Sequence, residues 1–234
     1  MRPYIICHML SSVDGKIDGE ALKAVTGQGE YEATGAKLKG DAWICGRTTM
    51  QQHFAEKNLF VSASNKPAGP QPVFVARKAK SYAISVDTLG KLRWRDNDLY
   101  GDHLICVVSE KASADYLTML RTEGISYIVS GKSSINLVDA VIKLREHFCI
   151  RSLLLEGGGN INGAFLESGL VDEVSLLLVP GIVGRHGIPA VFDGVNPSRH
   201  AAVSLKLSSV ERRTRGALWI RYTVVRSKTS KSKK

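Results

Sequence analysis

Cysteine is scarce in this chain, and its four cysteines form no recognisable pattern. Cys7, Cys45, Cys106 and Cys149 include no C-x-x-C pair, and three of them lie in short apolar runs. A zinc site is therefore not indicated, and we expect reduced, buried thiols. The longest early apolar run covers only residues 4–10, too short for a membrane span or a signal peptide. These absences predict a cytoplasmic protein with no metal site and no membrane contact.

Acidic residues are also fewer than basic ones. The chain has 22 Asp and Glu against 32 Lys and Arg, and its formal net charge is +10. Half of that excess lies in the last nine residues, so the remainder carries about +5, which suits a phosphate-bearing ligand without requiring nucleic acid. Hydrophobic residues make up 44% of the chain, which excludes general disorder and supports a large buried core.

Short apolar runs alternate with amphipathic segments along most of the chain. We expect strands at 4–10, 41–45, 73–76, 82–86, 104–108, 126–129 and 152–155, and helices at 29–38, 48–54, 112–122, 135–147 and 159–168. This alternation is typical of an α/β fold with a mainly parallel, doubly wound sheet. Strand-like segments at 174–179, 203–210 and 218–225 have no helix between them, and predict antiparallel strands at one edge.

No convincing linker interrupts residues 1–225, which we expect to form one domain. Residues 57–72 are rich in Ser, Asn, Gly and Pro and predict a surface loop within it. Residues 226–234 carry five basic side chains and no apolar one, so they predict a flexible basic tail.

Ligands of open α/β sheets bind beyond the carboxyl ends of the strands. Directly after the first predicted strand, Ser12, Asp14 and Lys16 offer a hydroxyl, a carboxylate and an ammonium group around a glycine turn. This set is suited to binding a substrate. An ordinary strand-exit turn of the Asp-Gly type is the alternative explanation.

The second candidate segment opens a helix after the second strand. Backbone N–H groups at a helix start lack partners and attract anions, and Arg47 adds a positive charge. Gly46, Arg47 and Thr49 are therefore candidates for binding phosphate, although a plain N-cap explains the pattern as well. His53, later in the same helix, is a candidate for the substrate side.

Three consecutive glycines, Gly157, Gly158 and Gly159, stand between a buried strand and a helix. Glycine lets the backbone approach a ligand closely, and a helix start favours a pyrophosphate. Because three glycines cost conformational entropy, we expect a functional reason for them. With Asn160 and Ile161 they are predicted to bind phosphate, although the G-x-G-x-x-G fingerprint is absent.

Other polar residues follow the same predicted strands. Glu156 would repel a phosphate, so we expect it to accept hydrogen bonds from sugar hydroxyls or substrate N–H groups. Ser109 lies at the same sheet edge, and Arg77 and Lys78 are candidates for the additional phosphate of NADPH, with a solvated surface charge as the alternative for Lys78. His8 lies inside the first strand and is interpreted as a core histidine.

Several motifs occur in a fixed order between residues 2 and 225. They are Ser12-x-Asp14-Gly15-Lys16, Gly46-x-x-Thr49, Val86-Asp87-x-x-Gly90-Lys91-Leu92, Val107-Val108-Ser109, Leu155-Glu156-Gly157-Gly158-Gly159 and Leu170-Val171-Asp172-Glu173. Together they resemble the riboflavin-biosynthesis reductase family. This is the C-terminal reductase domain of the bifunctional deaminase–reductase, which has a dihydrofolate-reductase-like fold.

The resemblance implies NADPH binding and reduction of 5-amino-6-(5-phosphoribosylamino)uracil, by hydride transfer to C1′ of the opened ribose. It places Thr49, Ser109 and residues 157–161 at the cofactor. It places Ser12, Asp14 and Glu156 at the substrate, with the two carboxylates as catalytic residues and Lys16 near the substrate phosphate. It also implies a homodimer. The zinc deaminase half has no counterpart, because H-x-E and P-C-x-x-C are absent.

The chain departs from the family after Thr49. Residues 50–54 read Met-Gln-Gln-His-Phe where the family commonly has Asp-Asp-Pro, and the loop that follows is longer. One alternative is therefore a related reductase of a pterin or another small heterocycle. Another is a basic nucleic-acid-binding protein, although no aromatic-basic platform or helix-turn-helix pattern accompanies the charge.

Overall fold

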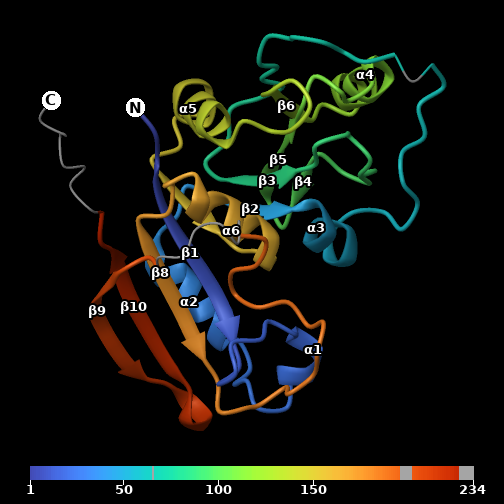
Figure 1. Ribbon diagram of the computed structural model, residues 1–234. Coiled ribbons are helices and arrows are strands. Elements are labelled where there is room, and N and C mark those ends of the chain that lie inside the picture. The colour runs from blue at the N-terminus through green and yellow to red at the C-terminus, as the bar shows by residue number, and fades with distance from the viewer. Residues whose placement is uncertain (65, 196–201, 227–234) are drawn as a thin grey trace, which may run out of the picture.

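The computed structural model describes residues 1–64, 66–195 and 202–226, which form a ten-stranded sheet with helices on both faces (Figure 1). The strands are β1 (Tyr4–Ser11), β2 (Ala42–Gly46), β3 (Tyr82–Val86), β4 (Asp98–Leu99), β5 (Asp102–Val108), β6 (Ser126–Val129), β7 (Ser152–Leu155), β8 (Glu173–Leu178), β9 (Leu205–Arg212) and β10 (Leu218–Val224). The α-helices are α1 (Gly19–Leu22), α2 (Glu30–Leu38), α3 (Arg47–His53), α4 (Ala114–Thr122), α5 (Leu137–Phe148) and α6 (Gly159–Glu167).

The strand order is β4-β5-β3-β2-β7-β1-β8-β10-β9, and β6 also pairs with β5. The pairs from β6 through β5, β3, β2, β7 and β1 to β8 are parallel, whereas β8–β10, β10–β9 and β4–β5 are antiparallel. The predicted parallel sheet with antiparallel C-terminal strands is therefore confirmed. Strands such as β3 and β5 read as continuous apolar runs because helices cover both faces of the sheet.

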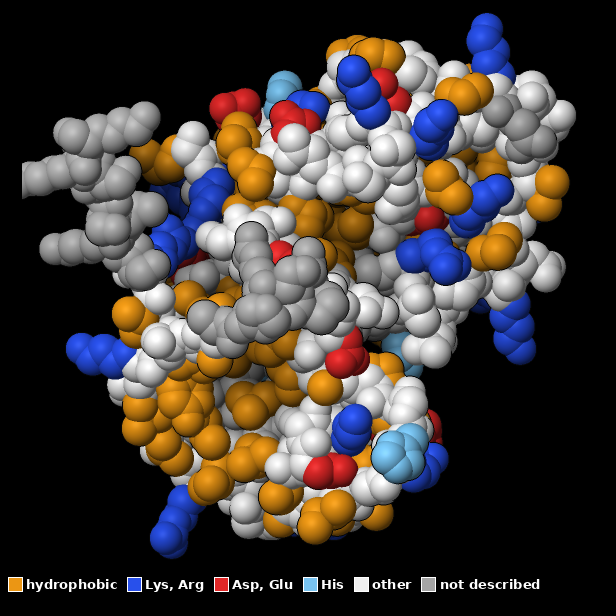
Figure 2. Space-filling model, viewed as in Figure 1, with side chains coloured by type: hydrophobic (Ala, Val, Ile, Leu, Met, Phe, Trp, Pro, Cys, Tyr) orange, Lys and Arg blue, Asp and Glu red, His pale blue; other side chains and the backbone are white. Residues whose placement is uncertain are grey.

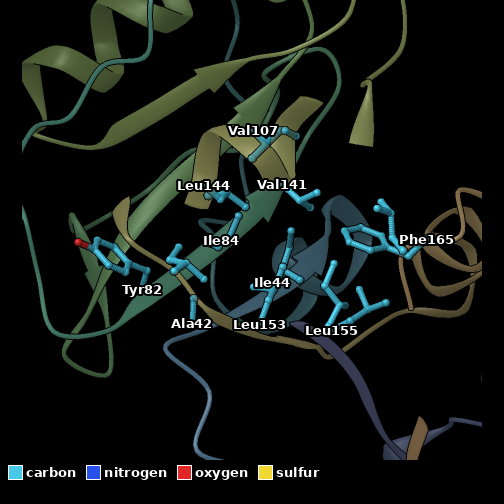
Figure 3. Close-up of a cluster of buried hydrophobic side chains, with 14 of the residues drawn as sticks. Ala42, Ile44, Tyr82, Ile84, Val107, Val141, Leu144, Leu153, Leu155 and Phe165 are labelled. Atoms are coloured by element: carbon cyan, nitrogen blue, oxygen red, sulfur yellow. The ribbon is translucent and has the colours of Figure 1, made fainter. Parts of the chain in front are cut away.

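The two sheet faces bury different sets of side chains. Ile44, Ile84, Val107 and Leu155 point toward α5 and α6, where they pack with Val141, Leu144 and Phe165 (Figure 3). Their neighbours along the strands, such as Cys45, Ala83 and Cys106, face α3 and α4 instead.

Two local predictions were wrong. Residues 73–76 form no strand of the sheet; Phe74 makes only an isolated antiparallel bridge to Tyr127. Cys149 is exposed, unlike the other three cysteines, because it caps the end of α5 in a left-handed conformation with φ 62°. The strand β4 was not predicted, because two residues are too few to show a hydrophobic pattern.

His8 is a core histidine, as expected. Its Nδ1 lies 3.0 Å from Ser175 Oγ, its Nε2 lies 3.3 Å from the carbonyl oxygen of Tyr31, and its ring stacks on that of Tyr31. Burial lowers its pKa to about 4, so the ring is neutral at physiological pH.

The expected tail is described only at its first residue. This residue, Arg226, forms an ion pair with Asp172 at 2.5 Å. Residues 227–234 lie outside the described part. Within the described residues no helix combines the length and apolar character needed to cross a membrane, and no three His, Cys, Asp or Glu side chains are grouped as a metal site.

Candidate active site

A cavity of about 890 Å³ opens at the carboxyl ends of the parallel strands. Strand ends contribute Met9, Gly46, Val86 and Glu156 to its wall. The remaining wall comes from four helices, α1, α3, α5 and α6, and from loops: Ile17, Asp18, Gly19, Glu20, Arg47, Thr48, Thr49, Gln52, His53, Thr88, Ile135, Leu137, Gly158, Gly159, Asn160, Ile161, Ala164, Ile188 and Pro189. This is the sheet edge at which the sequence predicts a ligand.

The glycine segment forms one side of this cavity. Gly158 caps α6 without a side-chain hydrogen bond, and no described acceptor receives the N–H groups of residues 158–161. Gly157 has φ +93°, and the peptide bond that joins it to Gly158 is cis. A Cβ on Gly159 would lie 2.4 Å from the carbonyl oxygen of Ala190. Gly159 is thus required for packing, whereas Gly158 borders the open cavity.

The start of α3 faces the same cavity. Gly46 caps it without a side-chain hydrogen bond, and Arg47, Thr48 and Thr49 line the wall. Arg47 is exposed and has no ion-pair partner among the described residues. The unsatisfied N–H groups of α6 and the guanidinium of Arg47 together suit a ligand that carries more than one phosphate group.

Among the ionisable groups that line the cavity, Glu156 has the pKa that departs most clearly from its ordinary value. It follows β7, is half-buried, and its carboxyl group has no hydrogen-bond partner among the described residues. Burial, with smaller contributions from the Asp102 and Glu32 carboxylates, raises its pKa to about 7. The protonated and ionised forms therefore coexist near neutral pH, which suits a group that exchanges a proton with a ligand.

Asp14 does not line the cavity. Its carboxylate accepts hydrogen bonds from Ser12 Oγ at 2.6 Å and from the backbone N–H groups of Val183 and Gly184 at 3.1 and 2.8 Å. The hydrogen bond from Ser12, followed by the two from the backbone, lowers its pKa to about 2. Asp14 is thus ionised at physiological pH and acts as an acceptor that holds a distant loop.

Ser12 and Lys16 complete this turn, and neither lines the cavity. Ser12 is fully buried, and its Oγ accepts a hydrogen bond from the Lys16 N–H at 2.8 Å. Lys16 Nζ donates to the carbonyl oxygen of Ile188 at 3.0 Å. The geometry here is that of the alternative explanation, a structured strand exit, which also fixes the segment after β8 (Figure 1). Of the predicted substrate-side residues, Glu156 and His53 line the cavity.

Three predicted cofactor residues lie elsewhere. Ser109 is buried, and its Oγ donates to the carbonyl oxygen of Thr88, which lines the cavity in its place. Arg77 lies at the amino end of β5, where its Nε donates to His103 Nδ1, and Lys78 contacts the carbonyl oxygen of His147. The prediction for both cations was wrong because residues 73–76 are not a parallel strand, so their end does not reach the carboxyl edge.

Sequence reasoning missed Asp18, Glu20 and the segment around Ile188. Asp18 caps α1, accepting from Ala21 N–H at 3.1 Å, and Asp-Gly-Glu is a weak helix-start signal that was available. Ile188 and Pro189 lie in the long loop that follows β8, and no local sequence pattern indicates that this loop returns to the cavity.

Comparisons with known proteins identify the family of the chain. The RibD C-terminal domain family matches residues 3–219. The 2,5-diamino-6-ribosylamino-4(3H)-pyrimidinone 5′-phosphate reductase of Methanothermobacter thermautotrophicus is 27% identical over 204 residues, which cover 83% of this chain and 85% of that protein. The protein of the same name from Archaeoglobus fulgidus is 22% identical over 200 residues, covering 83% and 88%.

Solved structures show the same fold. A pyrimidine reductase-like protein from Corynebacterium diphtheriae superposes with a TM-score of 0.71 at 16% identity, covering 96% of this chain and 93% of that one. Acinetobacter baumannii RibD gives a TM-score of 0.67 at 19% identity, and the match covers 58% of its chain. With a family match that extends over nearly the whole domain, the chain belongs to the RibD C-terminal domain family, as the order of its motifs predicts.

Proposed function

We propose that this chain reduces a phosphoribosylamino-pyrimidine of riboflavin biosynthesis with NADPH. The family makes the chain an oxidoreductase, and the archaeal relatives are named for such a substrate. The observation that carries the proposal is the position of Glu156. Its unpartnered carboxyl group, with a pKa of about 7, faces the same cavity as the uncapped start of α6.

The described residues fit a nicotinamide cofactor, which the reductase family implies. The N–H groups of residues 158–161 suit its pyrophosphate. Val86, Ile135 and Leu137 add an apolar wall for an aromatic ring. We choose NADPH rather than NADH because the guanidinium of Arg47, which forms no ion pair among the described residues, is available for the additional phosphate of NADPH. When bound, the reduced cofactor supplies a hydride.

Glu156 provides the matching proton in this proposal. Addition of a hydride to C1′ of the ring-opened ribose converts its CH=N group to CH2–N and leaves a negative charge on nitrogen. The protonated carboxyl group donates its proton there and regains one from water. A pKa near the working pH favours this role, because both the acid and its conjugate base are populated.

The lining also bears on the pyrimidine ring. Glu20 and Glu156 line the cavity, and their carboxylates accept hydrogen bonds, so a ring rich in N–H donors is favoured. A 2-amino-pyrimidinone, which still carries its amino group, offers more such donors than the uracil that the motifs imply. We therefore place the amino form first and the uracil second.

An anaerobic assay tests the function directly. The purified protein is given NADPH and either phosphorylated pyrimidine, and cofactor oxidation is followed together with formation of the ribitylamino product. We expect turnover with at least one of the two. Oxidation with a dihydropterin but with neither pyrimidine would establish the related-heterocycle alternative instead.

We also propose that two copies pair through β9. This edge strand is exposed along most of its length, with Leu205, Leu207 and Val210 42%, 53% and 50% exposed. Figure 2 shows apolar side chains gathered over β9 and β10. An open strand with apolar side chains is a ready surface for a second copy of the chain. Lys and Arg are spread over the face in Figure 2, which does not favour nucleic acid. A cytoplasmic location stays a prediction.

A further inference from the structure

The substrate end of the cavity is negatively charged, although the chain as a whole is basic. Asp18, Glu20 and Glu156 line this end. Among the described residues, Arg47 at the start of α3 is the one Lys or Arg that lines the cavity. That arginine is beside the free N–H groups of α6, where we place the cofactor. A substrate phosphate therefore needs another cation, because a phosphate beside carboxylates alone is repelled.

Arg185 is not part of the cavity wall, but it is paired with a residue that is. Its Nη2 lies 2.5 Å from Asp18 Oδ2, and Asp18 is itself part of the cavity wall. The Arg185 side chain remains 59% exposed, and no described acceptor receives its other N–H groups. One part of the guanidinium is thus held by Asp18, and the rest is free to bind a second anion.

The backbone on both sides of Arg185 is fixed. On one side Val183 and Gly184 donate their N–H groups to Asp14; on the other, Ile188 accepts from Lys16 Nζ. Figure 1 shows this segment after β8 passing beside α1. Because the loop is tied down at two places before a ligand arrives, little ordering entropy remains to be lost on binding.

We propose that Arg185 binds the phosphate of the substrate, with Asp18 holding the guanidinium toward the cavity. The proposal rests on the function proposed above and names the residue that recognises the anionic end. A guanidinium is suited to this task because its planar set of N–H donors engages a carboxylate and a phosphate at the same time.

The test compares the phosphorylated substrate with the same compound after phosphatase treatment. For the wild-type protein we expect a KM about 10- to 100-fold lower for the phosphorylated form, the usual range for a charged hydrogen bond. Arg185→Gln should raise the KM of the phosphorylated form by about that factor and leave the KM of the dephosphorylated form within about twofold. Arg185→Lys should recover part of the preference.

Two further variants separate phosphate binding from loop structure. Arg95→Gln removes another exposed arginine, one with no described ion-pair partner, and should leave the phosphate preference intact. Asp18→Asn removes the carboxylate that orients Arg185 but keeps the guanidinium, so the phosphate preference should shrink by less than it does in Arg185→Gln. If Arg185→Gln keeps the wild-type phosphate preference, or if Arg95→Gln reduces that preference as much, the proposal is overturned.

A binding measurement makes the proposal independent of turnover. Calorimetric titration with ribose 5-phosphate should show weaker binding to Arg185→Gln than to the wild type. Equal affinities, or equal KM changes for both substrate forms, would reject Arg185 as the phosphate ligand. The wild type could instead show no turnover while Arg185→Gln still weakens ribose 5-phosphate binding. That result would reject the proposed reaction but keep Arg185 as the phosphate ligand.

Discussion

The backbone N–H of Gly46 donates to the carbonyl oxygen of Gly157 at 2.9 Å, which ties the start of α3 to the segment that leads into α6. Both helix starts therefore border one cavity in a fixed relation, although more than a hundred residues separate them in the sequence. Arg47 and the free N–H groups of α6 can consequently act on one ligand.

Arg47→Gln is expected to weaken NADPH binding by about 10-fold or more while changing NADH binding less, because a guanidinium–phosphate hydrogen bond is lost. Fluorescence titration with both cofactors measures this. Arg77→Gln is the matched control, since Arg77 lies at the opposite sheet edge beside His103 and Asp98. Equal losses for both cofactors would remove Arg47 from the choice between them.

Neighbouring glycines should respond differently to a side chain. A Cβ on Gly158 meets Thr49 Oγ1 at an ordinary 3.5 Å, so Gly158→Val should fold and lose cofactor affinity by narrowing the cavity. Gly159→Ala clashes with the carbonyl of Ala190 and should cost about 1–3 kcal/mol of stability. Thermal melts beside cofactor titrations distinguish the two; a Gly158→Val protein with wild-type affinity would contradict the first expectation.

Asp14→Asn tests whether this carboxylate holds the loop or works on protons. The wild-type pKa of about 2 leaves no protonated form at neutral pH, so the pH profile of turnover should keep its shape. Loss of one strong acceptor should loosen residues 181–188 and raise the substrate KM. A profile that changes shape, with KM unaltered, would return Asp14 to a catalytic role.

The periodic parts of the fold were predictable because their cause is local. Buried parallel strands such as Leu104-Ile-Cys-Val-Val and helices such as α5 carry their pattern in adjacent residues. The glycine segment and Glu156 were found because a strand tip followed by unusual residues marks the carboxyl edge. Arg77 was misplaced because four apolar residues in a row do not show whether a segment joins the sheet or only bridges its edge.

The substrate side was much harder to predict. Asp14 and Lys16 contact residues more than 160 positions away, so no local pattern could show that they clamp a loop instead of facing a ligand. The position of Arg185 next to the cavity could not be predicted for the same reason, because it depends on an ion pair with the distant Asp18. Contacts of this range are set by the tertiary fold.

The exposed edge strand makes a prediction about assembly. Leu207→Lys places a charge in the middle of the apolar surface of β9, where Leu207 is already 53% exposed, so the folded monomer should tolerate it. We expect the wild type to be a dimer and the variant a monomer by light scattering. Leu89→Lys, at another exposed leucine, is the control and should remain dimeric. A monomeric wild type would reject the pairing.

Glu156 offers a test with two independent pH readouts. Its carboxyl group must be protonated to donate, so wild-type turnover should fall as the pH rises through about 7. Glu156→Gln keeps the shape of the side chain but carries no acidic proton, so turnover of this variant should be lower by about 10²-fold or more. Its pH profile should also lack the descending limb.

The pH dependence of folding stability gives the second readout for Glu156. The folded pKa lies above the ordinary value of 4.5, so between about 4.5 and 7 the folded state holds a proton that the unfolded state has released. Wild-type stability should therefore decline across that window, and the glutamine variant should decline less. Denaturant unfolding at several pH values measures this without any substrate. If the stability of the two proteins changes with pH in parallel, the pKa of Glu156 is not raised in the folded state. If the stability curves diverge but turnover of the variant equals that of the wild type, the pKa is raised but Glu156 does not serve as the acid.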